Sequence, residues 1–374
     1  MLRAILSSLL TLAVVPVRGE ERAPLAFAVP SADGTIIRGQ ADLPPATASA
    51  AVIFVAGSGA FDRDARLGRS GTDRDLLFKD LARRMTARGL MAVRYDKRGI
   101  IHARTGAEAF DHTALATVTT VNGRDDLAAV YAWARSPQGA GASCVLFFVH
   151  SEGMAHVARL AESGVSAPAF IIGMGALMES PLSVMRWQST ERDILSLQMM
   201  DADGDGRTTN AEVEANWRRT PSSVFDRLDL LLNPTGAWTR ADLDRVHATQ
   251  MEIYGRTRAE VLTHADADPF PSRPASSSSY EWWKSWFSDD TPVAQRLAHW
   301  RTRISLHYGD RDSQTLAERQ IAAARKAFPA DAVSTHIHEG VGHSLGTHVL
   351  YGPVDEGLVD ALADEAVAAS RACR

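Results

Sequence analysis

A serine lies between an apolar run and a helical pattern, in the Val-His-Ser-Glu-Gly segment at 149–153. The run at 144–149 predicts a buried strand, and the residues at 154–161 predict a helix. A serine at a tight strand-to-helix turn presents its hydroxyl at the top of a sheet, where it can attack an acyl carbon. Ser151 is therefore the candidate nucleophile.

Candidates for the acid and the base follow two later strands, in the chain order that such a serine requires. A predicted strand at 303–308 leads to Asp310 and Asp312, and one at 333–338 leads to His343. We expect His343 to accept the serine proton and Asp312 to hold the imidazole tautomer, with Asp310 as the alternative acid in the tight turn. The other candidates for the catalytic base are His150, His336, His338 and His348.

The tetrahedral oxyanion needs fixed hydrogen-bond donors, each worth about 3–4 kcal/mol of barrier. One expected donor is the backbone amide of Glu152, directly after the nucleophile. The other is expected in the glycine-rich turn after the strand at 51–55, at the amide of Ser58, with Gly59 as the alternative. This turn has neither the GxGxxG nor the GxxxxGK[ST] pattern, so a nucleotide site is not predicted.

Three motifs together resemble a family of bacterial serine α/β-hydrolases. They are a Gly-Ser-Gly turn followed by Asp-Arg-Asp at 57–64, Arg-Tyr-Asp-Lys-Arg-Gly at 94–99, and His-Ser-Glu-Gly at 150–153. The resemblance covers the regions around 50–175 and 280–350. It implies esterase-like hydrolysis, with peptidases and dienelactone hydrolases among the relatives.

Two positions near the nucleophile depart from the family, because Val149 and Met154 stand where it usually has glycine. A β-branched side chain at Val149 has the potential to crowd the turn. Asp96, at the end of a predicted strand, is interpreted as a structural acid rather than a catalytic one. Its expected partners are Lys97, Arg98 or Arg94.

The elements that position these residues alternate between strands and helices, which predicts a mostly parallel, doubly wound sheet of eight strands and the α/β-hydrolase fold. Ligands in such sheets bind at the carboxyl ends of the strands, where the three candidate residues lie. Strands are predicted at 25–29, 35–38, 51–55, 91–95, 144–149, 169–173, 304–308 and 333–338, and helices at 75–89, 124–136, 154–164, 314–327 and 355–371.

The long segment between the nucleophile and the acid predicts a helical lid over the site. The expected organisation is a signal peptide at 1–19, hydrolase core at 20–177, lid at 178–295 and hydrolase core again at 296–374. Serines at 276–279 predict a hinge near the end of the lid. The aromatic residues at 280–287 are interpreted mainly as contacts that fasten the lid to the core, with one ring facing an acyl pocket.

The lid contains the pattern Asp-Ala-Asp-Gly-Asp-Gly-Arg-Thr-Thr-Asn-Ala-Glu at 201–212. Acidic residues at loop positions 1, 3 and 5, glycine at 6 and glutamate at 12 match a calcium-binding EF-hand loop. Thr208 stands where an apolar residue usually pairs with a second loop, which is predicted as a degenerate loop at 233–244. The expected ligands of a structural calcium ion are Asp201, Asp203, Asp205, the Arg207 carbonyl, Thr209 and Glu212.

Composition limits the function classes. A chain of 374 residues that is 45% hydrophobic can bury a large core, and its net charge of −5 argues against nucleic-acid binding. Arg3 followed by an apolar stretch at 4–17 predicts an export signal, too short for a stable membrane span. In an oxidising compartment Cys144 and Cys373 can pair, or they remain a buried thiol and a frayed tail.

The sequence thus predicts a secreted or periplasmic serine hydrolase, most of all a carboxylesterase, that acts on a small ester or acyl compound. Amide, peptide or thioester hydrolysis by the same three residues is the alternative within the enzyme class. A calcium-dependent binding module on a hydrolase scaffold is the alternative from another class.

Overall fold

The structure is a computed structural model that describes residues 22–67, 72–102, 109–220, 228–268, 270, 278–346 and 353–373. The predicted signal peptide and His348 lie outside the described residues. Among the described helices, none is both long enough and apolar enough to cross a membrane.

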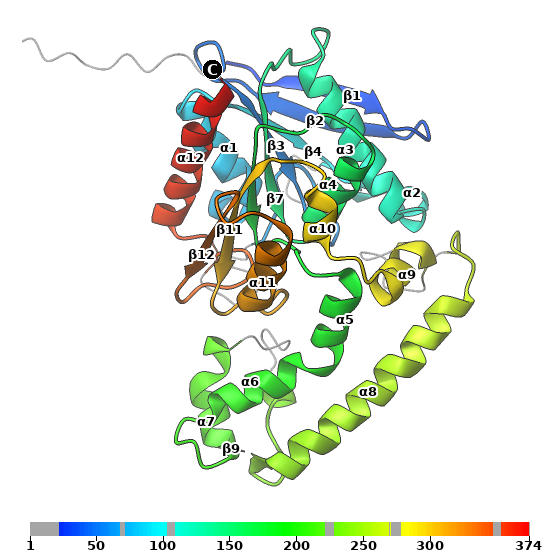
Figure 1. The fold of residues 1–374 in the computed structure, drawn as a ribbon, viewed down its shortest axis with the longest axis vertical. Helices are drawn as coiled ribbons and strands as arrows, with labels where there is room; N and C mark the ends of the chain where they lie inside the picture. The colour runs from blue at the N-terminus through cyan, green and yellow to red at the C-terminus, as the bar shows by residue number, and fades with distance from the viewer. Residues whose placement is uncertain are drawn as a thin grey trace, which may run out of the picture.

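An eight-stranded sheet forms the centre of the fold (Figure 1). The first two strands pair antiparallel at one edge, the second pairs antiparallel with β4, and the remaining strands are parallel. The predicted mostly parallel sheet is confirmed. In sheet order the strands are β1 (Leu25–Pro30), β2 (Ile36–Asp42), β4 (Met91–Tyr95), β3 (Ala51–Val55), β7 (Val145–His150), β8 (Phe170–Met174), β11 (Arg303–Gly309) and β12 (Val333–His338).

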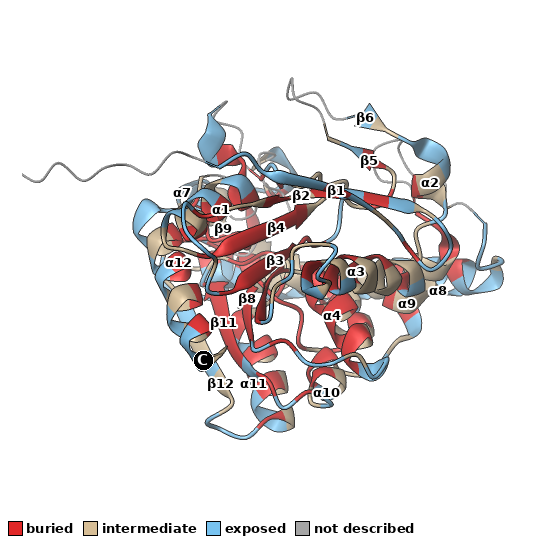
Figure 2. Ribbon diagram, turned by 90° about the horizontal axis from the view of Figure 1, so that it is seen from above, coloured by how far each residue is buried: buried red, intermediate tan, exposed pale blue. Residues whose placement is uncertain are grey.

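Helices cover both faces of the sheet, so its middle strands are continuously apolar rather than alternating. Strands β3, β7 and β8 are buried along their whole length, whereas β1 and β2 at the edge are partly exposed (Figure 2). One face packs against α3 (Thr120–Arg135), α4 (Gly153–Glu162), α10 (Val293–Leu297) and α11 (Ala317–Ala327), and the other against α1 (Leu77–Ala87) and α12 (Glu356–Ser370).

Strands β8 and β11 are neighbours in the sheet, and the segment between them projects from one end of the sheet core (Figure 1). Its longest helix, α8, has 24 residues and is about 36 Å long. The elements of this insertion are α5 (Pro181–Thr190), α6 (Arg192–Met200), β9 (Arg207–Thr209), α7 (Asn210–Asn216), β10 (Ala237–Thr239), α8 (Arg240–Thr263) and α9 (Tyr280–Ser288), which are followed by α10. Short elements elsewhere are β5 (Ile100–Ile101), β6 (Ala109–Phe110) and α2 (His112–Ala116), and 3-10 turns occur at Asp73–Asp75, Trp217–Arg219, Leu228–Leu230 and Arg371–Cys373.

The two cysteines are joined by a disulfide between the start of β7 and the end of the chain. Cys144 and Cys373 have Cα atoms 5.8 Å apart. Of the two alternatives in the sequence, the structure has the paired one, which fastens the C-terminal residues to the strand that carries Ser151.

Candidate active site

The candidate nucleophile occupies a strained position at the end of β7. Ser151 has a φ of 54°, in the left-handed region that non-glycine residues seldom adopt. The Ser151 amide donates to Met174 O at 3.0 Å, and the Leu177 amide donates to Ser151 O at 3.3 Å. Such strain persists only where the surrounding structure holds it, and it is concentrated at functional sites.

Two glycines allow the chain to pack tightly around this serine. A Cβ on Gly57 would lie 2.6 Å from the Ser151 Cβ, and one on Gly153 would lie 2.7 Å from Val55 O. Either contact would force a shift, so the turn after β3 and the first turn of α4 both depend on glycine at these positions.

The side chain of Met154 is accommodated by a third glycine. Val149 is fully buried in β7 and pairs directly with Gly173 of β8. A Cβ on Gly173 would lie 2.9 Å from Met154 Cε. The neighbouring strand therefore leaves the space that the Met154 side chain occupies.

The structure brings the expected base and acid together. The Nδ1 atom of His343 lies 2.9 Å from each carboxylate oxygen of Asp312, and both residues are only 2% exposed. The same carboxylate accepts hydrogen bonds from the Gln314 amide at 2.7 Å and from the Thr315 amide and hydroxyl at 2.8 and 2.7 Å. Thr315, which sequence reasoning missed, thus helps to fix the orientation of the acid.

The alternative acid has another role. The Asp310 carboxylate accepts the Gly340 amide at 2.8 Å, and its own amide donates to His338 O. These bonds fasten the loop after β11 to the loop after β12, which agrees with the tight-turn interpretation. The rings of His336 and His338, on the edge strand β12, stack beside His307 on the neighbouring strand β11.

The histidine before the nucleophile lies beside the base without replacing it. The ring centroid of His150 is 5.0 Å from that of His343, and its Nε2 atom is 3.2 Å from Ser344 Oγ. Burial lowers the pKa of His150 well below its usual value, and the neighbouring His343 and Lys97 lower it further. His150 is therefore a neutral neighbour of the base.

The two expected oxyanion donors line one cavity with the nucleophile. Neither the Ser58 amide nor the Glu152 amide donates to another group in the part of the chain that the structure describes. Lys97 Nζ donates to Gly57 O at 2.7 Å, which holds the turn that carries Ser58. Gly59, the alternative donor, lines the same cavity.

This cavity, here called the Ser151 cavity, has a volume of about 480 Å³ and is lined by both Ser151 and His343. Three tryptophans of α9 form part of its wall, so more rings face the cavity than the sequence predicted. Tyr280 and Phe287 instead pack with Tyr254 and Val261 inside the insertion, in the fastening role that was expected. The three tryptophans are Trp282, Trp283 and Trp286.

Asp96, which ends a strand, and Arg192, which lies near the loop of Asp312, have partners that the sequence did not indicate. Asp96 pairs with Arg63 rather than with a basic neighbour in its own motif. Arg192, at the start of α6, donates to Ser313 O at 2.8 Å, so the insertion contacts the loop that carries Asp312. Burial lowers the pKa of Arg192, and Asp193 and Asp312 oppose that shift.

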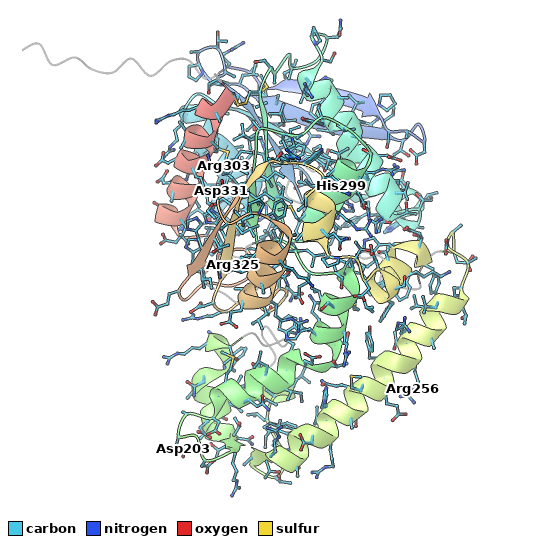
Figure 3. All side chains as sticks on the ribbon, viewed as in Figure 1. Asp203, Arg256, His299, Arg303, Arg325 and Asp331 are labelled. Atoms are coloured by element: carbon cyan, nitrogen blue, oxygen red, sulfur yellow. A yellow bond between two sulfur atoms is a disulfide. The ribbon has the colours of Figure 1, made fainter. Side chains whose placement is uncertain are left out.

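The predicted calcium loop lies at the end of the insertion farthest from the sheet core, where Asp203 is labelled in Figure 3. Carboxylate oxygens of Asp201, Asp203 and Asp205 lie within 4.8 Å of one another. Asp201 accepts the Gly206 amide at 2.9 Å, and Glu212 accepts the Ala202 amide at 2.9 Å. Glu212 is therefore folded back over the start of the loop, and the donor set fits a hard divalent cation.

Strand pairing corrects the position of the second loop. Thr208 of β9 pairs with Trp238 of β10. Since Thr208 occupies loop position 8, the second loop runs from 231 to 242, and the predicted 233–244 is wrong by two residues. Its position 1 is Leu231, only 3% exposed, whose side chain has no oxygen to offer a cation. Asp242 at position 12 caps α8 through Thr239.

Comparisons with known proteins agree with the architecture. No protein-family model matches the sequence, and no curated protein matches it. Among solved structures the chain is similar to Est1E from Butyrivibrio proteoclasticus, with 11% identity and a TM-score of 0.51 over 92% of this chain and 98% of that one. It is also similar to a thermophilic esterase from Thermogutta terrifontis, with 12% identity and a TM-score of 0.50 over 93% and 100%. The chain has the α/β-hydrolase fold.

Proposed function

We propose that this chain is a serine hydrolase that cleaves carboxylic esters through Ser151, His343 and Asp312. The observation that carries the proposal is the pairing of buried His343 with Asp312 at 2.9 Å, since His343 lines the same cavity as a strained serine. Ester cleavage is favoured over other acyl transfers by the likeness to an esterase. Amide, peptide or thioester hydrolysis at the same residues is the alternative.

The reaction proceeds in two half-reactions. The Ser151 hydroxyl attacks the acyl carbon while His343 takes its proton, and the amides of Ser58 and Glu152 stabilise the oxyanion. Collapse of the intermediate breaks the ester bond, and His343 returns the proton to the leaving alcohol. Water then attacks the acyl-serine with His343 again as base, which releases the acid and restores Ser151. Asp312 orients the imidazole.

A calcium ion is proposed as a structural ligand of the 201–212 loop. Asp201, Asp203, Asp205, Thr209 and Glu212 offer side-chain oxygens, and Arg207 offers its carbonyl. The ion would hold mutually repelling carboxylates together and so stabilise the insertion. No acyl-transfer step involves it.

Export to a secreted or periplasmic location is proposed from the apolar N-terminal stretch and is supported by the disulfide, since disulfides persist in oxidising compartments. The proposed substrate is a small ester or acyl compound, because the Ser151 cavity is of ordinary ligand size.

A fluorophosphonate probe tests the proposed function. We expect covalent modification of Ser151, located by peptide mass spectrometry, and no modification in Ser151→Ala. A panel of acyl esters, thioesters and peptide anilides then separates ester hydrolysis from its alternatives. A folded protein that neither reacts with the probe nor cleaves any member of the panel would favour the binding-module alternative.

A further inference from the structure

A second cavity adjoins the Ser151 cavity and does not include the nucleophile or the base. Its volume is about 330 Å³, at the lower end of the range of small-molecule sites. The two cavities share Ser58, Glu152 and Trp282 as lining residues, so the proposed oxyanion donors lie between them. From there the second cavity extends to the end of β4 and to α3.

The side chain of Glu152 is the most unusual group in this cavity. Glu152 is 3% exposed, and its Oε1 atom accepts the Trp282 indole N–H at 2.6 Å. Its Oε2 atom is buried and has no hydrogen-bond partner among the described residues. A buried polar atom without a partner is costly, and the cost is larger for a charged group. The position is therefore suited to a ligand that donates a hydrogen bond.

A donor lines the same cavity. Lys97 uses one of its ammonium protons on Gly57 O, which leaves two for another acceptor. Glu152 lies close enough to oppose the lowering of the Lys97 pKa by burial. The side chains of Lys97 and Glu152 thus line one cavity without forming an ion pair in the part of the chain that the structure describes.

A third polar group without a partner lines the cavity. His156 of α4 is 8% exposed, and its Nδ1 atom has no partner among the described residues. Gly123 of α3 packs against its ring, since a Cβ there would lie 2.5 Å from His156 Cε1. The lining also includes Arg98 and Asp126, which are paired with each other, and Ser278, whose buried hydroxyl has no partner among the described residues. Its apolar part is formed by Ile100, Leu115, Val118, Trp282 and Trp283.

These groups select one chemical class. A carboxylate would be repelled by Glu152, an ammonium would be repelled by Lys97, and an alkyl group would leave both unpaired. A hydroxyl accepts from Lys97 and donates to Glu152 at once. We propose that the second cavity binds an arm of the ester substrate that is apolar and carries one hydroxyl group, with Glu152 and Lys97 as the specificity-determining residues. This inference rests on the proposed hydrolase function.

Matched ester pairs test the proposal. The first pair, methyl 3-(4-hydroxyphenyl)propanoate and methyl 3-phenylpropanoate, carries the hydroxyl on the acyl arm. The second, 2-(4-hydroxyphenyl)ethyl acetate and 2-phenylethyl acetate, carries it on the alcohol arm. In at least one pair we expect kcat/KM to be about tenfold or more higher for the hydroxylated ester, because a site built to bind a hydroxyl rejects an analogue without it.

Substitutions of Glu152 and Lys97 test whether these residues cause the preference for the hydroxylated ester. Glu152→Gln and Lys97→Met should each bring the kcat/KM ratio of the preferred pair close to one. The matched control is Met185→Ala, which alters the Ser151 cavity but not the second cavity, and it should keep the ratio. A ratio near one in both pairs of the unaltered protein, or a ratio that Glu152→Gln leaves unchanged, overturns the proposal while the hydrolase function stands.

A binding measurement covers the case in which none of the four esters is cleaved. If Ser151 still reacts with the fluorophosphonate, 4-methylphenol should slow the reaction more than 4-methylanisole does, and Glu152→Gln should remove the difference. Equal protection by the two compounds overturns the inference. Failure of Ser151 to react at all refutes the proposed function instead.

Discussion

The acidic residues of the sheet core and those of the insertion are held in opposite ways. Asp312 is buried and receives hydrogen bonds from Gln314, Thr315 and His343, the last of which is brought in by another strand. Asp203 and Asp205 are exposed, and their carboxylates accept amides of their own loop. An acid that must orient a base needs fixed partners from distant segments, whereas acids that gather around a cation need only a local turn.

The largest expected effect concerns the core. Ser151→Ala should lower ester hydrolysis by at least about 10⁴-fold without unfolding the protein, because it removes the nucleophile and little volume. Turnover of a chromogenic ester and the circular dichroism spectrum measure the two effects. Ser163→Ala, at the far end of α4, is the control and should retain activity. Normal turnover by Ser151→Ala would remove the proposed mechanism.

Asp310 and Asp312 lie in one loop, and the same substitution at each should have very different effects on activity. Asp312→Asn should lower kcat/KM by about 10³–10⁴-fold, since the imidazole loses the partner that sets its tautomer. Asp310→Asn should change it by less than about threefold, because that carboxylate binds only a loop amide. The reverse order of effects would assign the acid role to Asp310.

Acid pH should destabilise the core through a buried imidazole. Burial lowers the pKa of His156 to about 4, against a usual value of 6.5. Between these pH values the unfolded state binds more protons than the folded state, so the free energy of unfolding falls as the pH is lowered through this window. The shift corresponds to about 3 kcal/mol.

Denaturant titrations at several pH values measure this effect. His156→Gln should reduce the fall in stability between about pH 6.5 and 4, and His112→Gln, which alters an exposed histidine, should leave it unchanged. An equal pH dependence in the unaltered protein and in His156→Gln would rule out His156 as the source.

The stability of the insertion should depend on calcium. Millimolar calcium should raise the melting temperature, with about 2.7 kcal/mol of added stability at a hundredfold excess over Kd. Asp201→Ala combined with Glu212→Ala should abolish the response, whereas Glu214→Ala, an exposed acid outside the ligand set, should retain it.

Fluorophosphonate labelling of the same samples shows whether loss of calcium from the insertion also affects the catalytic serine. Ser151 should still react when calcium is chelated. No change in melting temperature together with no bound metal by mass spectrometry would contradict the calcium site. Complete loss of labelling on chelation would show that the metal organises the catalytic centre, for which the Arg192–Ser313 contact offers a route.

The sheet was predictable because its central strands are largely apolar runs, and three of the strands are followed by a residue able to do chemistry. The runs before Ser151, Asp312 and His343 could be assigned without knowledge of their contacts, and chain order indicated which edge they share. What Glu152 touches was not predictable, because Trp282 reaches it from α9, a part of the chain distant in sequence.

The insertion was predictable only where its pattern is local. The 201–212 loop could be recognised from its own carboxylates, but the register of the second loop depends on strand pairing and not on the number of acids it contains. Helix α8 was missed as an individual element because most of its residues are exposed, and only Leu243, Tyr254 and Val261 are buried.

The adjacency of β8 and β11 has a consequence for the order of folding during synthesis. The strand that must pair with β8 leaves the ribosome only after the whole insertion, roughly ten seconds later at ordinary translation rates. Until then the apolar edge at Phe170–Met174 has no parallel neighbour on that side. The nucleophile elbow is therefore made early, while the segments that bear the acid and the base arrive last, which leaves a nascent intermediate prone to association through that edge.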